Sequence, residues 1–572
     1  MDVSYWNRVR ARRLSRRHAL VGAGGLGAAA FLAACGGGKK EEARATTAPG
    51  TQAGAAPAAA QPQGKPGGTL RINLKSAEPT TGFDPHATFS FRTHIALSFT
   101  HDRVMEFKVG PDAGEADYTP VPGLAEKVET PDKTTFVITL RKGVKFHNKP
   151  PVNGRELTSA DIKYTIERMI AKKFTYRDLF EGLVDKIETP DAATVRFTLA
   201  QPHADFLTNL ANHYSWIVAR EVDDQFGDMK KVEAVIGTGP FMLESYQPSV
   251  RAVWVKNPNF WIKGLPYLDR VEAVFVADEA SNEAMVRQGQ VEISTAILNP
   301  ALDAMKASAP NLKWWHYISA GGPVFYYRND KRPTDDVRVR RAIALGFDRQ
   351  SWLKSFELGR GAIDNGPPIL AAFKEWKLPT EQLGEGAQWY KYDVAAAKRL
   401  LAEAGYPNGF KAVMDAPNAA SYGQRTVDEE ELTKDFMSKI GIDLTINQKE
   451  YGNWLATGHA GIYDEFAYGP MTPYVSIDEW VYGMHHSKGG ANKAHLKDPK
   501  LDELLEKQRA EYDLNARKQI VNEIQKYVAN IVPYVWPPVG QTNVPYQPYV
   551  KGFRPKAGYN IGLVLRGTWI EK

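Results

Sequence analysis

The sequence predicts an α/β fold in which a globular part of about 500 residues is divided into two or more domains. Segments in which apolar and polar side chains alternate are interspersed with segments whose apolar residues have helical spacing, a succession typical of mixed α/β proteins. The globular part, which begins near Pro66, is too long for a single hydrophobic core. The chain has one cysteine, Cys35, and therefore cannot form an internal disulfide.

Strands are predicted where apolar residues recur at every second position. Leu70, Ile72 and Leu74 alternate with Arg71 and Asn73, a pattern that indicates a half-buried strand. Residues 136–140 repeat this alternation, and the Lys142-Gly143 turn then leads into residues 144–146.

Helices are predicted after residues that can cap them. Thr158 and Asp161 have the spacing of a capping box, and Asp393 can cap a second helix that Gly405 ends. The apolar face of the first helix holds Ile162, Ile166, Met169 and Ile170. The apolar face of the second holds Val394, Ala397, Leu400, Leu401 and Ala404.

The N-terminal residues 1–34 have the pattern of a secretory signal peptide. Six arginines lie within residues 8–17, and an uncharged run over residues 19–34 follows them. This run is shorter than the ~20 residues that a membrane span requires. The arginine pairs at 12–13 and 16–17 favour the twin-arginine export route, with an ordinary Sec signal as the alternative.

Cys35 is the predicted site of lipidation. Residues 32–36, Leu-Ala-Ala-Cys-Gly, resemble the bacterial lipobox, whose thiol is alkylated by diacylglycerol before cleavage. Residues 36–66 contain no aromatic residue and no Leu, Ile, Val or Met, so we expect residues 35–66 to form a disordered tether. The expected location is the outer face of the cytoplasmic membrane, in the periplasm or at the cell surface, with the lipid as anchor.

The basic charge of the chain belongs to its signal. The whole chain carries +6, and residues 1–34, with six Arg and one Asp, account for +5 of it. The remaining residues are nearly neutral, which argues against a nucleic-acid partner. No later stretch approaches 18 consecutive apolar residues, so we expect no membrane span after processing.

Four blocks of sequence, in order between about residues 68 and 550, resemble the peptide and nickel class of ABC-importer solute-binding proteins, bacterial extracellular solute-binding protein family 5. The second block contains Gly-Thr-Gly-Pro-Phe at 237–241, which predicts a tight turn that enters a strand. The blocks cover residues 122–126, 134–147 and 157–162; then 237–241, 257–261 and 264–269; then 337–342 and 347–349; and finally 392–410. With the lipobox, they indicate the lipoprotein form of this family.

The resemblance implies a bilobal periplasmic-binding-protein-like fold of class II, with an extra subdomain inserted in lobe one. Lobe one would span residues 67–318, with the insertion at about 102–232; lobe two would span 319–534; and residues 535–572 would return to lobe one. The chain would act as a monomer that captures a small-molecule ligand between its lobes. It would deliver the ligand to the permease subunits of an ABC importer.

The residues that hold the charged ends of a dipeptide in this family have no counterpart in our alignment. The amine-holding Asp aligns with Pro473 and the carboxylate-holding Arg aligns with Ala420, although Arg425 and Asp478 lie nearby. A buried ligand charge without a partner costs several kcal/mol, so a free dipeptide is not expected. The expected ligand is an oligopeptide held by its backbone or a neutral oligosaccharide. The candidate ligand-binding residues are Phe89, Ser90, Tyr422, Tyr468, Thr472, Tyr474 and Trp480.

No catalytic motif accompanies these residues. The chain lacks HExxH and GxSxG, and it has no cysteine pair, so we expect neither catalysis nor a cofactor. His485 and His486, as neighbours in a strand, would point to opposite faces and make poor joint metal ligands, so no metal site is assigned. The alternatives are an extracytoplasmic peptidase or glycosidase, a tethered sensor without an importer, and a binder of a nickel chelate.

Overall fold

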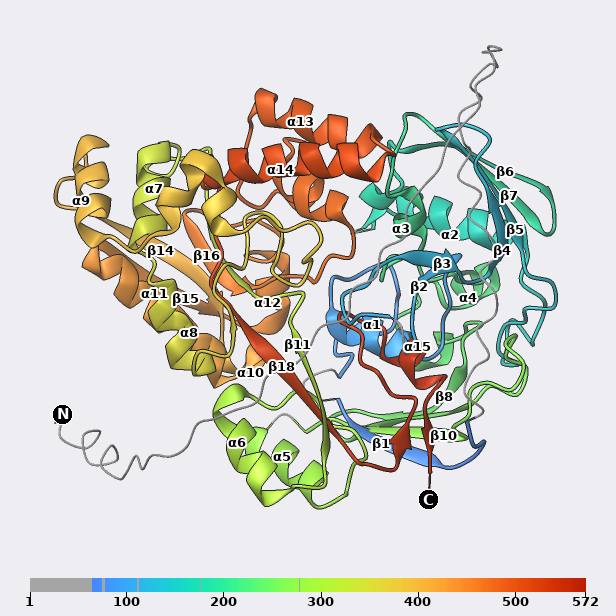
Figure 1. Ribbon diagram of the computed structural model, residues 1–572. Coiled ribbons are helices and arrows are strands. Elements are labelled where there is room, and N and C mark those ends of the chain that lie inside the picture. Colours follow the sequence, from blue (N-terminus) through green and yellow to red (C-terminus); the bar gives the residue numbers. More distant parts are fainter. Residues whose placement is uncertain (1–63, 75–77, 111–112, 175, 277, 572) are drawn as a thin grey trace, which may run out of the picture. The chain divides into compact units, whose positions relative to one another are not determined.

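The computed structural model describes residues 64–571, except for residues 75–77, 111–112, 175 and 277 (Figure 1). The predicted signal peptide, Cys35 and most of the predicted tether lie outside the described residues. The predicted α/β class is confirmed, because helices and sheets alternate along the chain and gather in two lobes. Among the helices that the structure describes, none combines the length and the apolar character needed to cross a membrane.

Lobe one is built on a four-stranded sheet in the order β1-β10-β9-β8. Its first strand confirms the predicted alternation, because Leu70 and Ile72 are buried in the core of this lobe. β1 pairs with β10 in parallel, whereas β10, β9 and β8 pair in antiparallel fashion. The strands are β1 (Thr69–Asn73), β8 (Phe241–Gln247), β9 (Arg251–Lys256) and β10 (Arg270–Val274), and α1 (Phe91–Leu97) packs against α15 (Ile561–Leu565).

A second, antiparallel sheet in the order β4-β5-β7-β6 forms most of the insertion in lobe one. Its strands are β4 (Ala125–Glu129), β5 (Thr135–Leu140), β6 (Val184–Asp191) and β7 (Thr194–Leu199), and α2 (Ser159–Ala171) packs on them. The predicted capping box begins this helix, because the Thr158 amide donates to Asp161 Oδ2 at 2.8 Å. Ile162, Ile166 and Met169 then enter the core as expected.

Lobe two is built on a five-stranded sheet in the order β15-β14-β16-β12-β17. Figure 1 shows α7, α8, α9 and α11 grouped with this sheet. Asp393 caps α9, and Gly405 follows it at a positive φ of 96°, as the sequence predicted. The elements are β12 (Pro323–Tyr327), α7 (Val337–Gly346), α8 (Arg349–Glu357), α9 (Val394–Glu403), β14 (Phe410–Pro417), α11 (Gln424–Lys439), β15 (Ile442–Lys449), β16 (Phe466–Pro470) and β17 (Tyr534–Val535).

Two long strands carry the chain between the lobes. β11 (Lys313–Ile318) pairs with β18 (Val539–Tyr546) in antiparallel fashion. β11 precedes β12 of lobe two, and β18 follows β17, so the outgoing and returning segments lie side by side (Figure 1). After β18 the chain forms β19 (Val550–Lys551), α15 and β20 (Trp569–Ile570).

Apolar packing also joins the lobes. A single cluster of buried side chains includes Phe136 and Tyr214 of the insertion together with Trp454, Trp480 and Tyr534 of lobe two. The two lobes therefore meet through hydrophobic contact as well as through the crossing strands. The remaining elements are β2 (Met105–Phe107), β3 (Pro120–Pro122), α3 (Phe206–Leu210), α4 (Arg220–Phe226), α5 (Glu279–Arg287), α6 (Asn299–Ser308), β13 (Gly361–Ala362), α10 (Ala419–Tyr422), α12 (Tyr451–Ala456), α13 (Pro499–Ala510) and α14 (Leu514–Ile531).

Candidate ligand-binding site

A cavity of about 450 Å³ lies between the insertion of lobe one and the segment 459–509 of lobe two. This volume falls in the range of small-molecule sites, about 300–1,000 Å³. The walls are mixed, with aromatic rings beside a few charged groups. Lobe one contributes, among others, Phe89, Tyr176, Asp178 and His203, and lobe two contributes His459, Tyr474, Glu479, Tyr482, Lys493 and Arg509.

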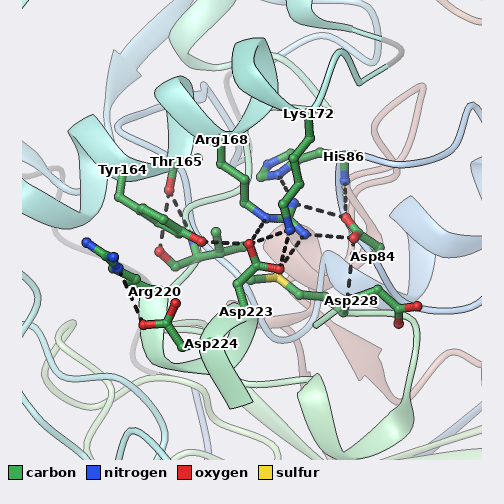
Figure 2. A network of polar contacts seen from close by, with 12 residues as sticks. Asp84, His86, Tyr164, Thr165, Arg168, Lys172, Arg220, Asp223, Asp224 and Asp228 are labelled. Atoms are coloured by element: carbon green, nitrogen blue, oxygen red, sulfur yellow. Dashed lines mark hydrogen bonds and ion pairs between the residues drawn. The ribbon is translucent and has the colours of Figure 1, made fainter. Parts of the chain in front are cut away.

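A buried ionic network fixes the loop that carries Phe89 into the cavity. Figure 2 shows Arg168 of α2 between Asp84 of this loop and Asp223 of α4. Arg168 donates to Asp84 Oδ2 at 2.8 Å and to Asp223 Oδ2 at 3.0 Å, and its Nη1 lies 3.0 Å from His86 Nδ1. Burial opposes ionisation of Asp84, but Arg168 outweighs it and lowers the pKa of this carboxyl. The loop is therefore tied to the insertion by charge-assisted hydrogen bonds.

Aromatic rings from both lobes meet at the cavity. The Phe89 ring lies edge-on to Tyr176, with centroids 5.1 Å apart, and edge-on to His459 of lobe two at 5.5 Å. Tyr176 stacks in turn on Tyr214. On the lobe-two side, Tyr474 packs edge-on against Trp480, with centroids 5.1 Å apart. Such surfaces suit apolar side chains or flat faces of a ligand.

Two carboxyl groups line the cavity with weakened acidity. Glu479 Oε1 accepts from the Asn212 amide at 3.0 Å, and its Oε2 accepts from the backbone amides of Val475 and Ser476 at 3.1 Å. Burial nevertheless raises the pKa of Glu479 to about 7. Asp178 also lines the cavity and is exposed there, and desolvation by the surrounding side chains raises its pKa to about 6. Both groups are thus poised to gain stability from a cation.

Lys493 is a buried cation in the same cavity. The residue is only 7% exposed, and its Nζ has no hydrogen-bond partner among the residues that the structure describes. Burial lowers the pKa of Lys493 to about 7, with no carboxylate to oppose the shift. Burial lowers the pKa of the His459 imidazole, and the nearby charge of Lys493 lowers it further.

Asp478 and Arg425, the charged residues that lie near the missing family anchors in the sequence, are both paired with protein groups. Asp478 accepts from Arg509 at 2.7 Å and from Gln508 at 2.7 Å. Burial opposes its ionisation, but Arg509 holds the pKa of Asp478 well below the ordinary value. Arg425 pairs with Glu357 at 2.5 Å and Glu429 at 2.8 Å, beside a separate cavity of about 280 Å³.

A buried ion pair joins the lobes next to the cavity. Arg517 of α14 donates to both oxygens of Asp205 in the insertion, each at 2.7 Å, and the side chains are 7% and 12% exposed. The Asp478 amide also donates to Asp205 Oδ2 at 3.0 Å, and His203 Nε2 lies 3.3 Å from Asp478 Oδ2. These contacts lock the insertion against lobe two at one side of the cavity.

Of the seven predicted ligand-binding residues, Phe89 and Tyr474 line the cavity, one from each lobe. Ser90 begins α1, and its hydroxyl lies 2.9 Å from Tyr451 Oη across the lobes. Tyr422 stacks on Phe91 and packs near Tyr451. Neither Ser90 nor Tyr422 belongs to the lining of this cavity, and their role as ligand contacts stays a prediction.

The other three predicted residues lie behind the cavity wall. Tyr468 is buried in the core of lobe two and donates to Glu429 Oε2 at 3.3 Å. Thr472 is buried beside Tyr474, and Trp480 is fully buried against Tyr474, Phe373 and Trp536. Trp480 Nε1 has no hydrogen-bond partner within the described part of the chain. The contacts of these residues with a ligand also stay predictions.

Sequence reasoning did not single out Tyr176, Asp178, Glu479 and Lys493, which line the cavity. No local pattern marks them, because folding brings them together from segments about 300 residues apart. Of these four residues, Glu479 could have been noticed in the sequence, because it lies between Asp478 and Trp480, which were both considered as possible ligand contacts.

The expectation for His485 and His486 rested on a wrong premise. They follow a π-helical turn, Glu479–Gly483, and do not lie in a strand. His485 Nδ1 faces the backbone oxygens of Trp480 and Val481, whereas His486 Nε2 lies 3.3 Å from Glu506. Among the described residues, no three or more His, Cys, Asp or Glu side chains are arranged to hold a metal ion.

Comparison with known proteins identifies relatives along most of the chain. The di/tripeptide-binding protein 2 of Pseudomonas aeruginosa (strain UCBPP-PA14) is 27% identical over 508 residues, covering 84% of this chain and 91% of that protein. The dipeptide-binding protein of Escherichia coli (strain K12) is 26% identical over 497 residues, covering 82% of this chain and 90% of that protein.

Solved structures share the fold. The ABC transporter-associated periplasmic binding protein from Helicobacter pylori, in complex with the peptide STSA, superposes with a TM-score of 0.75 at 23% identity, covering 89% of this chain and 99% of its own. A binding protein from A. tumefaciens R10 in complex with agropinic acid gives 0.75 at 25% identity, covering 88% and 99%. The predicted bilobal class II fold with an inserted subdomain is therefore confirmed.

A family model matches more than half of the chain, residues 119–492. Its members are binding proteins, which agrees with the expectation that the chain is not an enzyme. The chain belongs to the bacterial extracellular solute-binding proteins, family 5.

Proposed function

We propose that this protein captures a short peptide between its two lobes and delivers it to the permease subunits of an ABC importer. The observation that carries the proposal is the cavity of about 450 Å³, whose walls come from both lobes. A ligand enclosed in this way contacts both lobes at once, so binding favours the closed arrangement. Delivery to a permease follows from the family, whose members serve ABC importers.

The relatives support a peptide as the ligand class. The relatives from Pseudomonas aeruginosa and Escherichia coli are a di/tripeptide-binding and a dipeptide-binding protein, and an oligopeptide-binding protein of Bacillus subtilis with the same fold is in complex with a nonapeptide. The edge-on rings of Phe89 and Tyr176 offer an apolar surface for peptide side chains. Neutral oligosaccharide is the second candidate, because the same rings could stack on sugar faces.

The membrane attachment and the lobe boundaries are part of the proposal. Lipidation of Cys35 would hold residues 67–572 outside the cytoplasmic membrane, behind a tether formed by residues 35–66. Lobe one would comprise residues 67–318 and 535–572, and lobe two residues 319–534. The paired crossing strands β11 and β18 lie close to both proposed boundaries and support them.

The test is binding without turnover. Purified protein is titrated calorimetrically with pools of di- to pentapeptides and, separately, with maltotriose, and the ligand is recovered and weighed by mass spectrometry. We expect one peptide per chain, recovered unchanged, and a smaller radius of gyration in small-angle scattering with the ligand bound. Binding of maltotriose alone would favour the second candidate, whereas cleaved ligand or no binding to either pool would contradict the proposal.

A further inference from the structure

Lys493 is a charged group that has no counter-charge among the residues that the structure describes. It lines the cavity, its ammonium is shielded from solvent, and no oxygen or nitrogen within the described residues bonds to it. Arg509, a partly buried cation of the same lining, is already paired with Asp478. Lys488 also lines the cavity, but it is exposed to solvent.

Within the described part of the chain, Lys493 has one compensating contact, and it is weak. Its Nζ lies 5.5 Å from the centroid of the Tyr326 ring, a cation–π distance near the outer limit of such contacts. An ammonium that leaves water needs a stronger partner than this to remain charged. A ligand anion in the cavity would be such a partner. His459 also lines the cavity, and its Nδ1 has no hydrogen-bond partner among the described residues.

Two carboxyl groups of the lining have no cationic partner among the described residues. Asp178 has no salt bridge and no side-chain hydrogen bond among the described residues. It approaches the backbone of Gly490 so closely that a Cβ at this position would collide with Asp178 Oδ2. Gly490 and Lys493 lie three residues apart, so their Cα atoms are at most about 10 Å apart, within reach of a short peptide. Glu479 accepts neutral amide donors and has no cationic partner among the described residues.

We propose that the cavity takes a charge-separated ligand, whose anionic group pairs with Lys493 and whose cationic group faces Asp178 and Glu479. Lys493 then replaces the arginine anchor missing at Ala420, and Asp178 with Glu479 replaces the aspartate missing at Pro473. The inference rests on the proposed function and revises the expectation that a peptide with free charged ends is not the ligand. It assigns a zwitterionic peptide rather than a neutral sugar to the site.

The anionic half is tested with peptides that differ at one end. Wild-type protein is mixed with a pool of di- to pentapeptides and with the same pool carrying C-terminal amides, and retained peptide is quantified by native mass spectrometry. We expect amidation to weaken apparent affinity at least about thirtyfold, as for loss of one partner of a buried charge pair. Lys493→Met should bind free peptides more weakly than the wild type by the same factor, and amidation should weaken its binding no further. Lys493→Arg should keep part of the preference for a free carboxylate.

The cationic half is tested in the same way with N-acetylated peptides. Asp178→Asn combined with Glu479→Gln should abolish the preference for a free amino group. The matched controls are Lys142→Met and Glu503→Gln, which change exposed charges outside the cavity lining and should leave both preferences intact. Thermal unfolding of each variant confirms that it remains folded.

The outcomes separate this inference from the proposed function. Peptides that bind equally well free, amidated and acetylated would overturn the charge-separated ligand but leave the peptide-binding function standing. The same holds if Lys493→Met binds free peptides as tightly as the wild type. Binding of maltotriose with no retention of any free peptide would overturn both.

Discussion

The ion pair between Asp205 and Arg517 makes a prediction about how the lobes close on a ligand. It joins the insertion of lobe one to α14 of lobe two through two hydrogen bonds of 2.7 Å, and both side chains are almost fully buried. Burial opposes ionisation of Asp205, but Arg517 outweighs it and lowers the pKa of the carboxyl. If the lobes separate without ligand, both groups return to water, so the pair stabilises the closed state selectively.

The magnitude follows from what Asp205→Asn leaves behind. Removing one partner of a buried pair leaves an uncompensated charge and costs about 3–5 kcal/mol. We expect the lower end, about 3 kcal/mol, because the side-chain amide oxygen of the substituted asparagine can still accept one hydrogen bond from Arg517. If this cost falls on the closed state alone, ligand affinity decreases roughly 100-fold.

Calorimetry with the peptide that the wild-type protein retains measures this effect. Asp205→Asn should bind roughly 100-fold more weakly, and the double variant with Arg517→Met should recover part of the loss, because no charge is then left unpaired. Asp224→Asn is the matched control, since its pair with Arg220 is exposed at 63% and 70%, and affinity should change less than about twofold. Affinity of Asp205→Asn within about twofold of the wild type would refute selective stabilisation of the closed state.

Three further predictions concern the anchor, the acid stability and the aromatic wall. Cys35→Ser should move the protein from the membrane fraction to the soluble fraction with its thermal unfolding unchanged, and an unchanged membrane fraction would exclude lipidation there. The stability that the ion pairs of Asp84 and Asp223 contribute should be present above about pH 4 and fall as the pH approaches 2. Burial opposes ionisation of Asp84 and Asp223, but Arg168 lowers the pKa of Asp84, and Arg168 with Lys172 brings the pKa of Asp223 to about 2. Asp223→Asn should flatten this acid limb in urea titrations, and an unaltered profile would refute the assignment. Trp480→Ala should weaken ligand binding by about 1–3 kcal/mol through loss of packing behind Tyr474, and calorimetry that shows no change would place Trp480 outside the site.

The local elements were predictable because their signals are local. The capping box at Thr158 and Asp161 and the alternation at Leu70 and Ile72 each specify a strand or helix within a few residues. The bilobal arrangement could not be worked out from these patterns, and it came from the resemblance of ordered sequence blocks. Pairing of β11 with β18 joins residues more than 220 positions apart, which no periodicity reveals.

The candidate site was predictable only in part. Phe89 was predicted from its place on the loop that faces the ligand in this family, and Tyr474 as an aromatic ring near the missing anchors, and both line the cavity. Tyr468 was chosen as an aromatic ring that could contact a ligand, but its position in β16 directs it into the core of lobe two. Lys493 escaped notice, because a lysine in a loop ordinarily faces water, and only the packing around it buries the side chain. Asp178 is exposed, and only folding brings it to the same cavity as Lys493.

Native mass spectrometry of the protein with an equimolar pool of free di- to pentapeptides tests the central claim most directly. We predict a complex of one peptide per chain, whose peptide is released by denaturation with unchanged mass. A protein that stays at its unliganded mass throughout the pool, or that releases shortened peptides, would contradict the account.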